Sequence, residues 1–310
     1  MLYKKESGKL IKLEDDGFHN EKELQKFVEE NIEKLLGLKF IATEFSISDR
    51  RRVDTLAYDE ESNAFVIIED KNVKNSSLVD QGFSYLSVAL DRKESLVLQF
   101  NGMMNAQKKV GDFDWSQTRI IFISPEYNDR QIEATSFGDM PFQLFELKKY
   151  GDIISWRDLT KKIKGVTPRL KTVPECEDRE ESTLAEIKVY TEDDIITDSN
   201  PAYPQYLDLR ERILELPDVT MVVLKSGIKF KVNGKRFGEV DKSGVSDKMG
   251  KFDFLIANGD TITDSNDLLK DISNRKWGNL KHRIIVNPDA DMDSVMYPIK
   301  KSYEIAKRAS

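Results

Sequence analysis

Asp54, Glu69 and Lys71 are the residues of this sequence whose types and spacing could do chemistry together. Asp54 lies near the start of the apolar stretch 53–59, and Glu69 and Lys71 end the next one, AFVIIEDK at 64–71. Two carboxylates that converge on one point are oxygen ligands for a hard divalent cation such as Mg²⁺ or Mn²⁺. An ammonium group beside them can orient a water molecule and stabilise developing negative charge. The three side chains therefore predict metal-dependent attack on a phosphodiester.

A β-hairpin is the element that must bring these groups together. The polar residues 60–63 separate the two apolar stretches, which suits antiparallel pairing and directs Asp54 toward Glu69. Because side chains alternate along a strand, Glu69 and Lys71 face the same way and Asp70 faces the other.

A helix is expected directly after the hairpin, with Ser77 or Asp80 as its cap. Gln81 and Tyr85 then lie at i and i+4 on one edge of this helix. Such a pair can hold the lysine, a water molecule or a phosphate.

Glu29 is a candidate for a further carboxylate. It lies on the predicted helix 20–37, which begins with Asn20 and Glu23 as a capping box and ends at Gly37. On a helical wheel Glu29 falls at the margin of the apolar stripe. A solvated flank position is the alternative for a glutamate on this helix.

Arg52 is a candidate for contact with phosphate groups, since it ends the basic turn DRRR at 49–52. It shares a strand face with Asp54, so an ion pair between the two is the alternative.

The Glu-x-Lys pattern is weak by itself, because a third of the residues are charged. It occurs three times, at Glu69/Lys71, Glu146/Lys148 and Glu186/Lys188. Only the first occurrence follows a five-residue apolar run, has an aspartate on the strand before it and has a Gln/Tyr helix after it.

Asp54, Glu69-x-Lys71 and Gln81-x-x-x-Tyr85 resemble the PD-(D/E)XK nuclease superfamily, in its RecB-like and archaeal-endonuclease branches. The segments LQKFVEEN, VDTLAYD, VIIEDK and DQGFSYL are similar to a two-domain family sometimes labelled predicted transport proteins. The segments WGNLKHRIIV and IKKSYEIAK resemble the C-terminal domain of unknown function in that family.

The resemblance implies an N-terminal restriction-endonuclease-like mixed sheet flanked by helices. It also implies that Asp54 and Glu69 bind Mg²⁺ or Mn²⁺, that Glu29 completes the metal site, and that Lys71 positions the nucleophile. Gln81 would assist. The substrate contacts expected of Arg52 and Tyr85 come from the basic turn and the helical Gln/Tyr pair described above. The sequence departs from the motif at Val53, which stands where the motif's name has proline.

The composition limits the compartment and the kind of metal site. No apolar run is long enough to span a bilayer, and the N-terminus lacks the apolar core of a signal peptide. One cysteine, Cys176, excludes an internal disulfide, and two histidines leave little imidazole chemistry. We therefore expect a cytoplasmic protein whose metal ligands are carboxylates.

The charge distribution indicates two domains. Residues 174–199 contain ten acids and two bases, so the net charge of −7 belongs largely to this segment. We expect a nuclease-like domain at 1–165, an acidic connector at 166–199 and a small α+β domain at 200–310. In the first domain we expect strands at 39–47, 53–59, 64–71, 95–100, 118–124 and 142–147. In the last we expect helices at 203–216, 265–274 and 292–307, with strands between them.

Two functions stay open. The first is metal-dependent phosphodiester hydrolysis of nucleic acid, with DNA as the expected substrate. The alternative is a catalytically silent nuclease-fold module that binds DNA or a protein partner, recruited through the C-terminal domain. A homodimer is compatible with either function, and no segment supports a membrane role.

Overall fold

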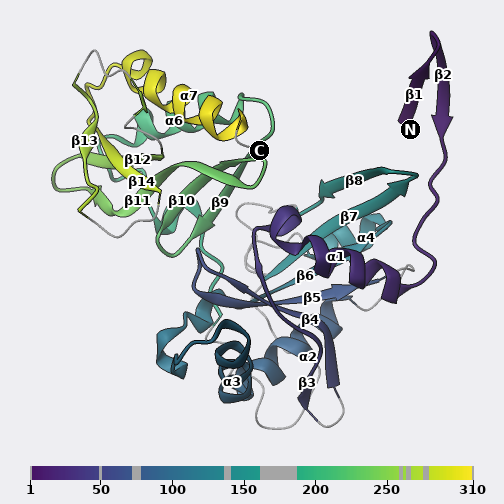
Figure 1. Ribbon diagram of the computed structural model, residues 1–310. Coiled ribbons are helices and arrows are strands. Elements are labelled where there is room, and N and C mark those ends of the chain that lie inside the picture. The colour runs from purple at the N-terminus through teal and green to yellow at the C-terminus, as the bar shows by residue number, and fades with distance from the viewer. Residues whose placement is uncertain are drawn as a thin grey trace. The chain divides into compact units, whose positions relative to one another are not determined.

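The computed structural model describes residues 2–48, 51–71, 78–135, 141–160, 187–257, 261–262, 267–274 and 279–308. The chain folds as two compact units, residues 1–189 and 190–310 (Figure 1).

Unit 1 is built on a six-stranded mixed sheet in the order β3-β4-β5-β6-β7-β8. Strands β5, β6 and β7 are parallel, and the other neighbours are antiparallel. The strands are β3 (Lys39–Ser48), β4 (Arg51–Asp59), β5 (Ala64–Asp70), β6 (Arg119–Ser124), β7 (Phe142–Tyr150) and β8 (Ile153–Asp158). Every residue of β5 is buried, because helices cover both faces of the sheet.

Helix α1 (Glu21–Leu36) packs on one face of this sheet through Leu24, Val28 and Ile32. Helices α2 (Leu78–Asp91) and α3 (Lys93–Met104) contribute to the core on the other face. A short helix, α4 (Asp129–Thr135), lies between β6 and β7 in the chain. The predicted mixed α/β class of unit 1 is confirmed.

The start of α1 follows the predicted cap. The Asn20 Oδ1 atom accepts a hydrogen bond from the Glu23 backbone N–H at 2.9 Å. The Glu23 carboxylate accepts from the His19 N–H at 2.8 Å, one residue before the position that a strict capping box requires. Gly37 ends the helix with a φ of 69°, a conformation that favours glycine.

The strand predicted at 95–100 is wrong, because these residues belong to α3. Leu96, Val97 and Phe100 are buried at spacings of one and three, which fits one face of a helix. A short apolar run does not distinguish a strand from a buried helix by periodicity alone.

Gly82 lets α2 pack closely against the sheet. A Cβ atom at this position would lie 2.8 Å from two ring atoms of Phe142 and 3.2 Å from Phe122. We expect Gly82→Ala to destabilise unit 1 by about 1–3 kcal/mol, because the buried rings have little room to move. Gly102→Ala on α3 is the matched control, since its Cβ meets nothing within 4 Å. Urea unfolding of both variants checks this, and an equal effect would contradict the close packing.

A hairpin that the sequence analysis missed lies at the N-terminus of unit 1. Strands β1 (Leu2–Glu6) and β2 (Lys9–Leu13) pair in register, and Ser7 and Gly8 form the turn. Both turn residues have positive φ, 49° and 82°, as a two-residue hairpin turn requires.

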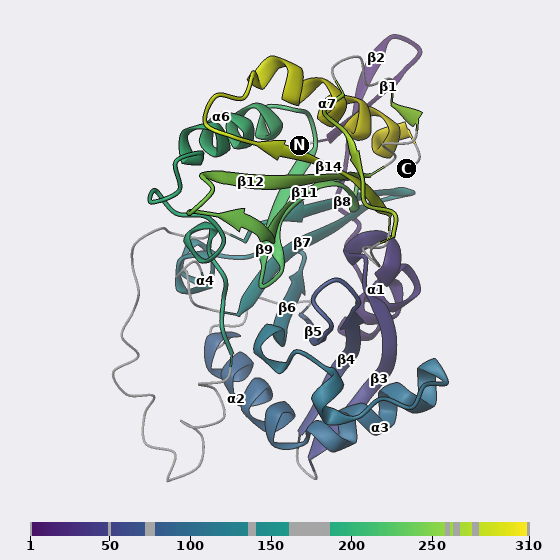
Figure 2. The same ribbon diagram turned by 90° about the vertical axis from the view of Figure 1, so that its left-hand side faces the viewer.

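Unit 2 has an antiparallel sheet in the order β13-β14-β12-β11-β10-β9. Helices α6 and α7 lie side by side on it (Figure 2) and bury their apolar faces in one core with the sheet. The elements are α6 (Tyr203–Leu214), β9 (Val219–Leu224), β10 (Gly227–Val232), β11 (Lys235–Ser246), β12 (Lys251–Ala257), β13 (Lys270–Asp271), β14 (Leu280–Val286) and α7 (Met292–Arg308). The predicted small α+β class is confirmed.

Two details of unit 2 differ from the sequence analysis. Ile195 and Ile196 are part of its core, so this unit begins about ten residues before the predicted start at 200. The helix predicted at 265–274 is wrong for its described part, in which β13 pairs with β14. Of the helices that the structure describes, none has the length and apolarity to span a bilayer.

Candidate active site

The β4–β5 hairpin brings Asp54 and Glu69 together, as the sequence analysis predicted. The register pairs Thr55 with Ile68, which sets Asp54 beside the end of β5. The Asp54 Oδ2 atom accepts a hydrogen bond from the Asp70 backbone N–H at 2.9 Å. Residues opposite one another in an antiparallel pair share a face of the sheet, so both carboxylates lie on the face that α2 covers.

Three donors converge on one oxygen of Glu69. The Lys71 Nζ atom and the Gln81 Nε2 atom each lie 3.0 Å from Glu69 Oε1, and the Tyr85 hydroxyl lies 3.4 Å from it. Gln81 also donates to the Tyr85 hydroxyl at 3.1 Å. The predicted helical pair and the lysine therefore meet at one carboxylate.

The other oxygen of Glu69 is buried and makes no hydrogen bond of ordinary length among the described residues, although the Asp54 backbone N–H lies close enough to the carboxylate to lower its pKa. The whole residue is only 2% exposed. A buried carboxylate oxygen without a donor is unfavourable unless the group is protonated or a cation neutralises it.

Burial raises the pKa of both acids of the site. Burial and the neighbouring charge of Asp54 raise the pKa of Glu69 to about 7. Burial also raises the pKa of Asp54, against the lowering effects of the Asp70 N–H and Lys71. Ionisation of both carboxylates is unfavourable at this short separation unless a metal ion lies between them.

Lys71 stays charged in this setting. Burial lowers the pKa of its amine, but the charge of Glu69, the hydrogen bond to it and the charge of Asp54 raise the pKa more. Lys71 is therefore a donor of hydrogen bonds and positive charge at neutral pH, and is poorly suited to act as a base.

Glu29 lies on the other face of the sheet. Its Oε1 atom accepts from the Thr55 hydroxyl at 2.7 Å and from Gln25 at 3.0 Å. Gln25 also donates to the Asp54 carbonyl oxygen at 2.7 Å, so α1 supports the strand that carries Asp54. These hydrogen bonds involve neither Asp54 nor Glu69, and the role of Glu29 as a metal ligand stays a prediction.

Gln25 and Asp70 are site residues that the sequence analysis missed. Gln25 precedes Glu29 by one helical turn, and this spacing could have indicated a hydrogen bond between the two side chains. Asp70 is fully buried, and neither carboxylate oxygen has a partner within the described part of the chain. Burial and the charges of Asp54 and Glu69 raise its pKa well above the ordinary value.

Arg52 does not pair with Asp54. Its guanidinium lies 2.7 Å from Glu44 Oε2, and its side chain remains 59% exposed. Arg51 instead donates to the Ser84 carbonyl oxygen on α2 at 3.1 Å. Arg52 is thus accessible, as a contact with phosphate requires, but such a contact competes with Glu44.

The second Glu-x-Lys pair has a different environment. Glu146 is held by Arg157 through hydrogen bonds to Oε1, and Lys148 lies 3.5 Å from Oε2. Both oxygens of Glu146 therefore have cationic partners, unlike those of Glu69. Glu186 of the third pair lies outside the described residues.

The described residues contain no group of three or more histidine, cysteine, aspartate and glutamate side chains arranged to hold a metal ion. They present two carboxylates, Asp54 and Glu69, with a buried oxygen left over. This donor set fits a hard divalent cation that completes its shell with water and substrate oxygens.

Comparisons with known proteins place the chain in a family. It is 36% identical to an uncharacterized protein of Haemophilus influenzae, over 97% of this chain and 98% of the relative. The chain belongs to the same family as that protein. No protein-family model matches the sequence.

Three solved structures are similar to part of the chain. An EndoMS–dsDNA2 complex and a repair endonuclease from Pyrococcus abyssi are each 18% identical, cover 44% and 43% of this chain, and have TM-scores of 0.23 and 0.22. The match spans half of each of these two chains. SfsA of Pyrococcus furiosus in complex with Ca²⁺ is 15% identical, with 52% of this chain and 77% of that chain covered and a TM-score of 0.25.

Proposed function

We propose that this protein hydrolyses phosphodiester bonds of nucleic acid, with DNA as the expected substrate, in a reaction that depends on Mg²⁺ or Mn²⁺. The observation that carries the proposal is the asymmetry of Glu69. Three donors hold Oε1, whereas the buried Oε2 makes no hydrogen bond of ordinary length among the described residues and belongs to a carboxylate beside Asp54. The similarity of the motif to PD-(D/E)XK nucleases supports nucleic acid as the substrate class.

Asp54 and Glu69 would hold the cation, and Glu29 stays the predicted further carboxylate. When bound, a divalent cation supplies Lewis acidity at the phosphoryl oxygen and lowers the pKa of a coordinated water. Its charge also favours the ionised form of both acids, which burial otherwise disfavours.

The protein's own side chains would orient the attacking water and stabilise the negative charge that develops on the phosphoryl group. Gln81 and Tyr85 hold Oε1 of Glu69, which would leave Oε2 for the cation. The Lys71 ammonium would donate a hydrogen bond to the attacking water or to a phosphoryl oxygen that gains negative charge. Arg52 at the exposed end of β4 would contact a neighbouring phosphate.

Cleavage of a substrate panel tests the proposal. Linear, single-stranded, branched and mismatched DNA and RNA are incubated with Mg²⁺, Mn²⁺ or EDTA. We expect products only with a divalent ion, and none from Asp54→Asn, which keeps the shape of the side chain but removes its charge. Asp193→Asn, at an exposed aspartate of unit 2, is the matched control. Binding of nucleic acid without cleavage in any metal would favour the silent module, and absence of both would refute both functions.

A further inference from the structure

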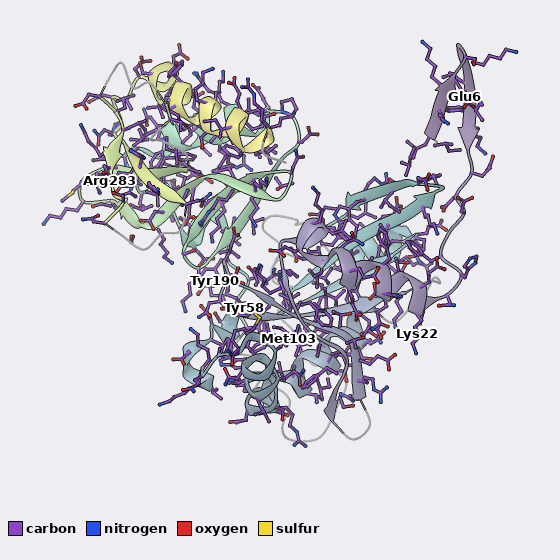
Figure 3. All side chains as sticks on the ribbon, in the orientation of Figure 1. Glu6, Lys22, Tyr58, Met103, Tyr190 and Arg283 are labelled. Atoms are coloured by element: carbon purple, nitrogen blue, oxygen red, sulfur yellow. The ribbon has the colours of Figure 1, made fainter. Side chains whose placement is uncertain are left out.

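The β1–β2 hairpin exposes large apolar side chains to solvent. Leu2, Tyr3, Leu10 and Ile11 are 38%, 50%, 70% and 47% exposed. Figure 3 shows the side chains of both strands, with Glu6 labelled near the free end. A lone two-stranded hairpin is only marginally stable in water, and its outer edges keep unpaired N–H and C=O groups. Contact with a further strand or apolar surface would therefore stabilise the hairpin.

The root of the hairpin is fixed at the turn between β7 and β8. The Asp16 backbone N–H donates to the Lys149 carbonyl oxygen at 2.9 Å, and Asp16 Oδ2 accepts from the Gly151 N–H at 2.5 Å. Only Glu14 and Asp15 separate this anchor from the end of β2. In the structure the hairpin stands apart from the six-stranded sheet, and β1 and β2 pair with none of its described strands.

An acceptor for a further strand lies at the same turn. Of the described strands, β8 pairs with β7 alone, so its outer edge is open. A groove of about 410 Å³ lies between α1 and the β7–β8 turn, with Phe18, Phe27 and Ile154 in its lining. Ile153, the first residue of β8, is 46% exposed. An added strand would pair with the edge and cover this apolar surface.

We propose that two copies of this chain exchange their β1–β2 hairpins, each hairpin adding to the β8 edge of the other copy. The strands match in length, since β1 and β2 have five residues and β8 has six. Because the donor root and the acceptor edge lie at one turn, a single two-fold axis near this turn satisfies both exchanges. Such a contact is closed and self-complementary, as stable homodimers require.

Nucleic acid is the competing occupant, because the hairpin carries Lys4, Lys5, Lys9 and Lys12. Two of these lysines already have acidic partners, Lys4 with Glu6 at 3.4 Å and Lys12 with Glu14 at 3.0 Å. Phosphate contacts would also leave the apolar side chains in water. The apolar surface and the open strand edges therefore favour a second copy.

The mass of the full chain in solution, measured by sedimentation equilibrium, tests the exchange. We expect twice the 35.7 kDa of one chain for the natural protein. The arm variant Leu10→Lys/Ile11→Lys and the edge variant Ile153→Lys/Ser155→Lys should both have the mass of one chain, because lysine opposes strand addition at an edge. Leu98→Lys, at a 75% exposed leucine of α3, is the matched control and should keep the double mass. Circular dichroism verifies that every variant is folded.

Mixing the two monomeric variants gives the decisive result. The edge variant keeps an intact hairpin and the arm variant keeps an intact β8, so one exchange can form and a dimer should return. A monomeric natural protein, an arm variant with unchanged double mass, or a mixture that stays monomeric would overturn the proposal. The proposal would also be overturned if the arm variant kept its mass but lost binding to nucleic acid. That result would show that the hairpin contacts nucleic acid. The measurement needs no substrate and is independent of the proposed catalysis.

Discussion

Replacing Lys71 by alanine is expected to lower metal-supported cleavage by roughly 10²- to 10³-fold, the loss typical of a removed electrostatic donor in an active site. The ammonium lies 3.0 Å from Glu69 Oε1, with its side chain only 14% exposed, so water replaces its charge poorly. Its pKa is raised by the charges of Glu69 and Asp54 despite burial, so it acts as a cation throughout the neutral range. Initial rates at saturating Mg²⁺ measure the effect.

Lys148→Ala is the matched control, because Lys148 occupies the same place in the second Glu-x-Lys pair. Glu146 keeps Arg157 as a partner when Lys148 is removed, so the sheet should remain intact. We expect its cleavage rate to stay within about two-fold of that of the natural protein, because Lys148 contacts no residue of the candidate site and its ion pair contributes little. Equal losses in the two variants would show that Lys71 acts through stability and has no special place in the reaction.

The core of the candidate site could be predicted because its geometry is local. Asp54, Glu69 and Lys71 lie on two strands joined by a short turn, so alternation and pairing alone bring them to one face. Gln81 and Tyr85 follow in the next helix, one turn apart. None of these positions required knowledge of how distant elements pack.

The contacts of Glu29 and Arg52 could not be predicted in this way. The helical wheel gives the angle of Glu29 on α1, but not the face of the sheet against which α1 packs. That choice sends Glu29 to Thr55 on β4, whereas its contact with Gln25 lies within α1 itself. Arg52 meets Glu44 because β3 pairs with β4 in a register that sets Ser46 opposite Arg52 and makes Glu44 its diagonal neighbour, and this register could not be read from the residue pattern.

The error at α3 has a similar origin. Residues 95–100 are an apolar run that either a strand or a buried helix accommodates, and the hydrophobic pattern does not decide between them. Packing of Leu96 and Phe100 against the core of unit 1 decides it. The N-terminal hairpin was missed for a different reason. Ser7-Gly8 is a local turn signal, but the strands that flank it bury no apolar face, so no hydrophobic pattern indicated them.

Without divalent ions, unit 1 is expected to lose stability as the pH rises from about 4.5 to about 7. Burial and Asp54 raise the pKa of Glu69 from 4.5 to about 7, so the folded state binds more protons than the unfolded chain in this window. Stability therefore falls with rising pH, and Glu69 contributes about 3 kcal/mol of this fall across the window at 1.36 kcal/mol for each pH unit, while Asp54 and Asp70, whose pKa values are also raised, act in the same direction. Urea unfolding at pH 5 and pH 8, followed by Trp115 and Trp156 fluorescence in a Trp277→Phe background, measures the difference.

Glu69→Gln separates this effect from other buried acids, such as Glu239 in unit 2, whose pKa is also raised by burial. The amide cannot ionise, so the variant should be more stable than the natural protein at pH 8 and similar to it at pH 5. Mn²⁺ should stabilise the natural protein at pH 8, since it binds the ionised carboxylates and only the folded state presents them together. The same addition should leave Glu69→Gln almost unchanged. Equal stabilisation of the two proteins by Mn²⁺ would place the cation elsewhere and remove the physical basis of the proposed reaction.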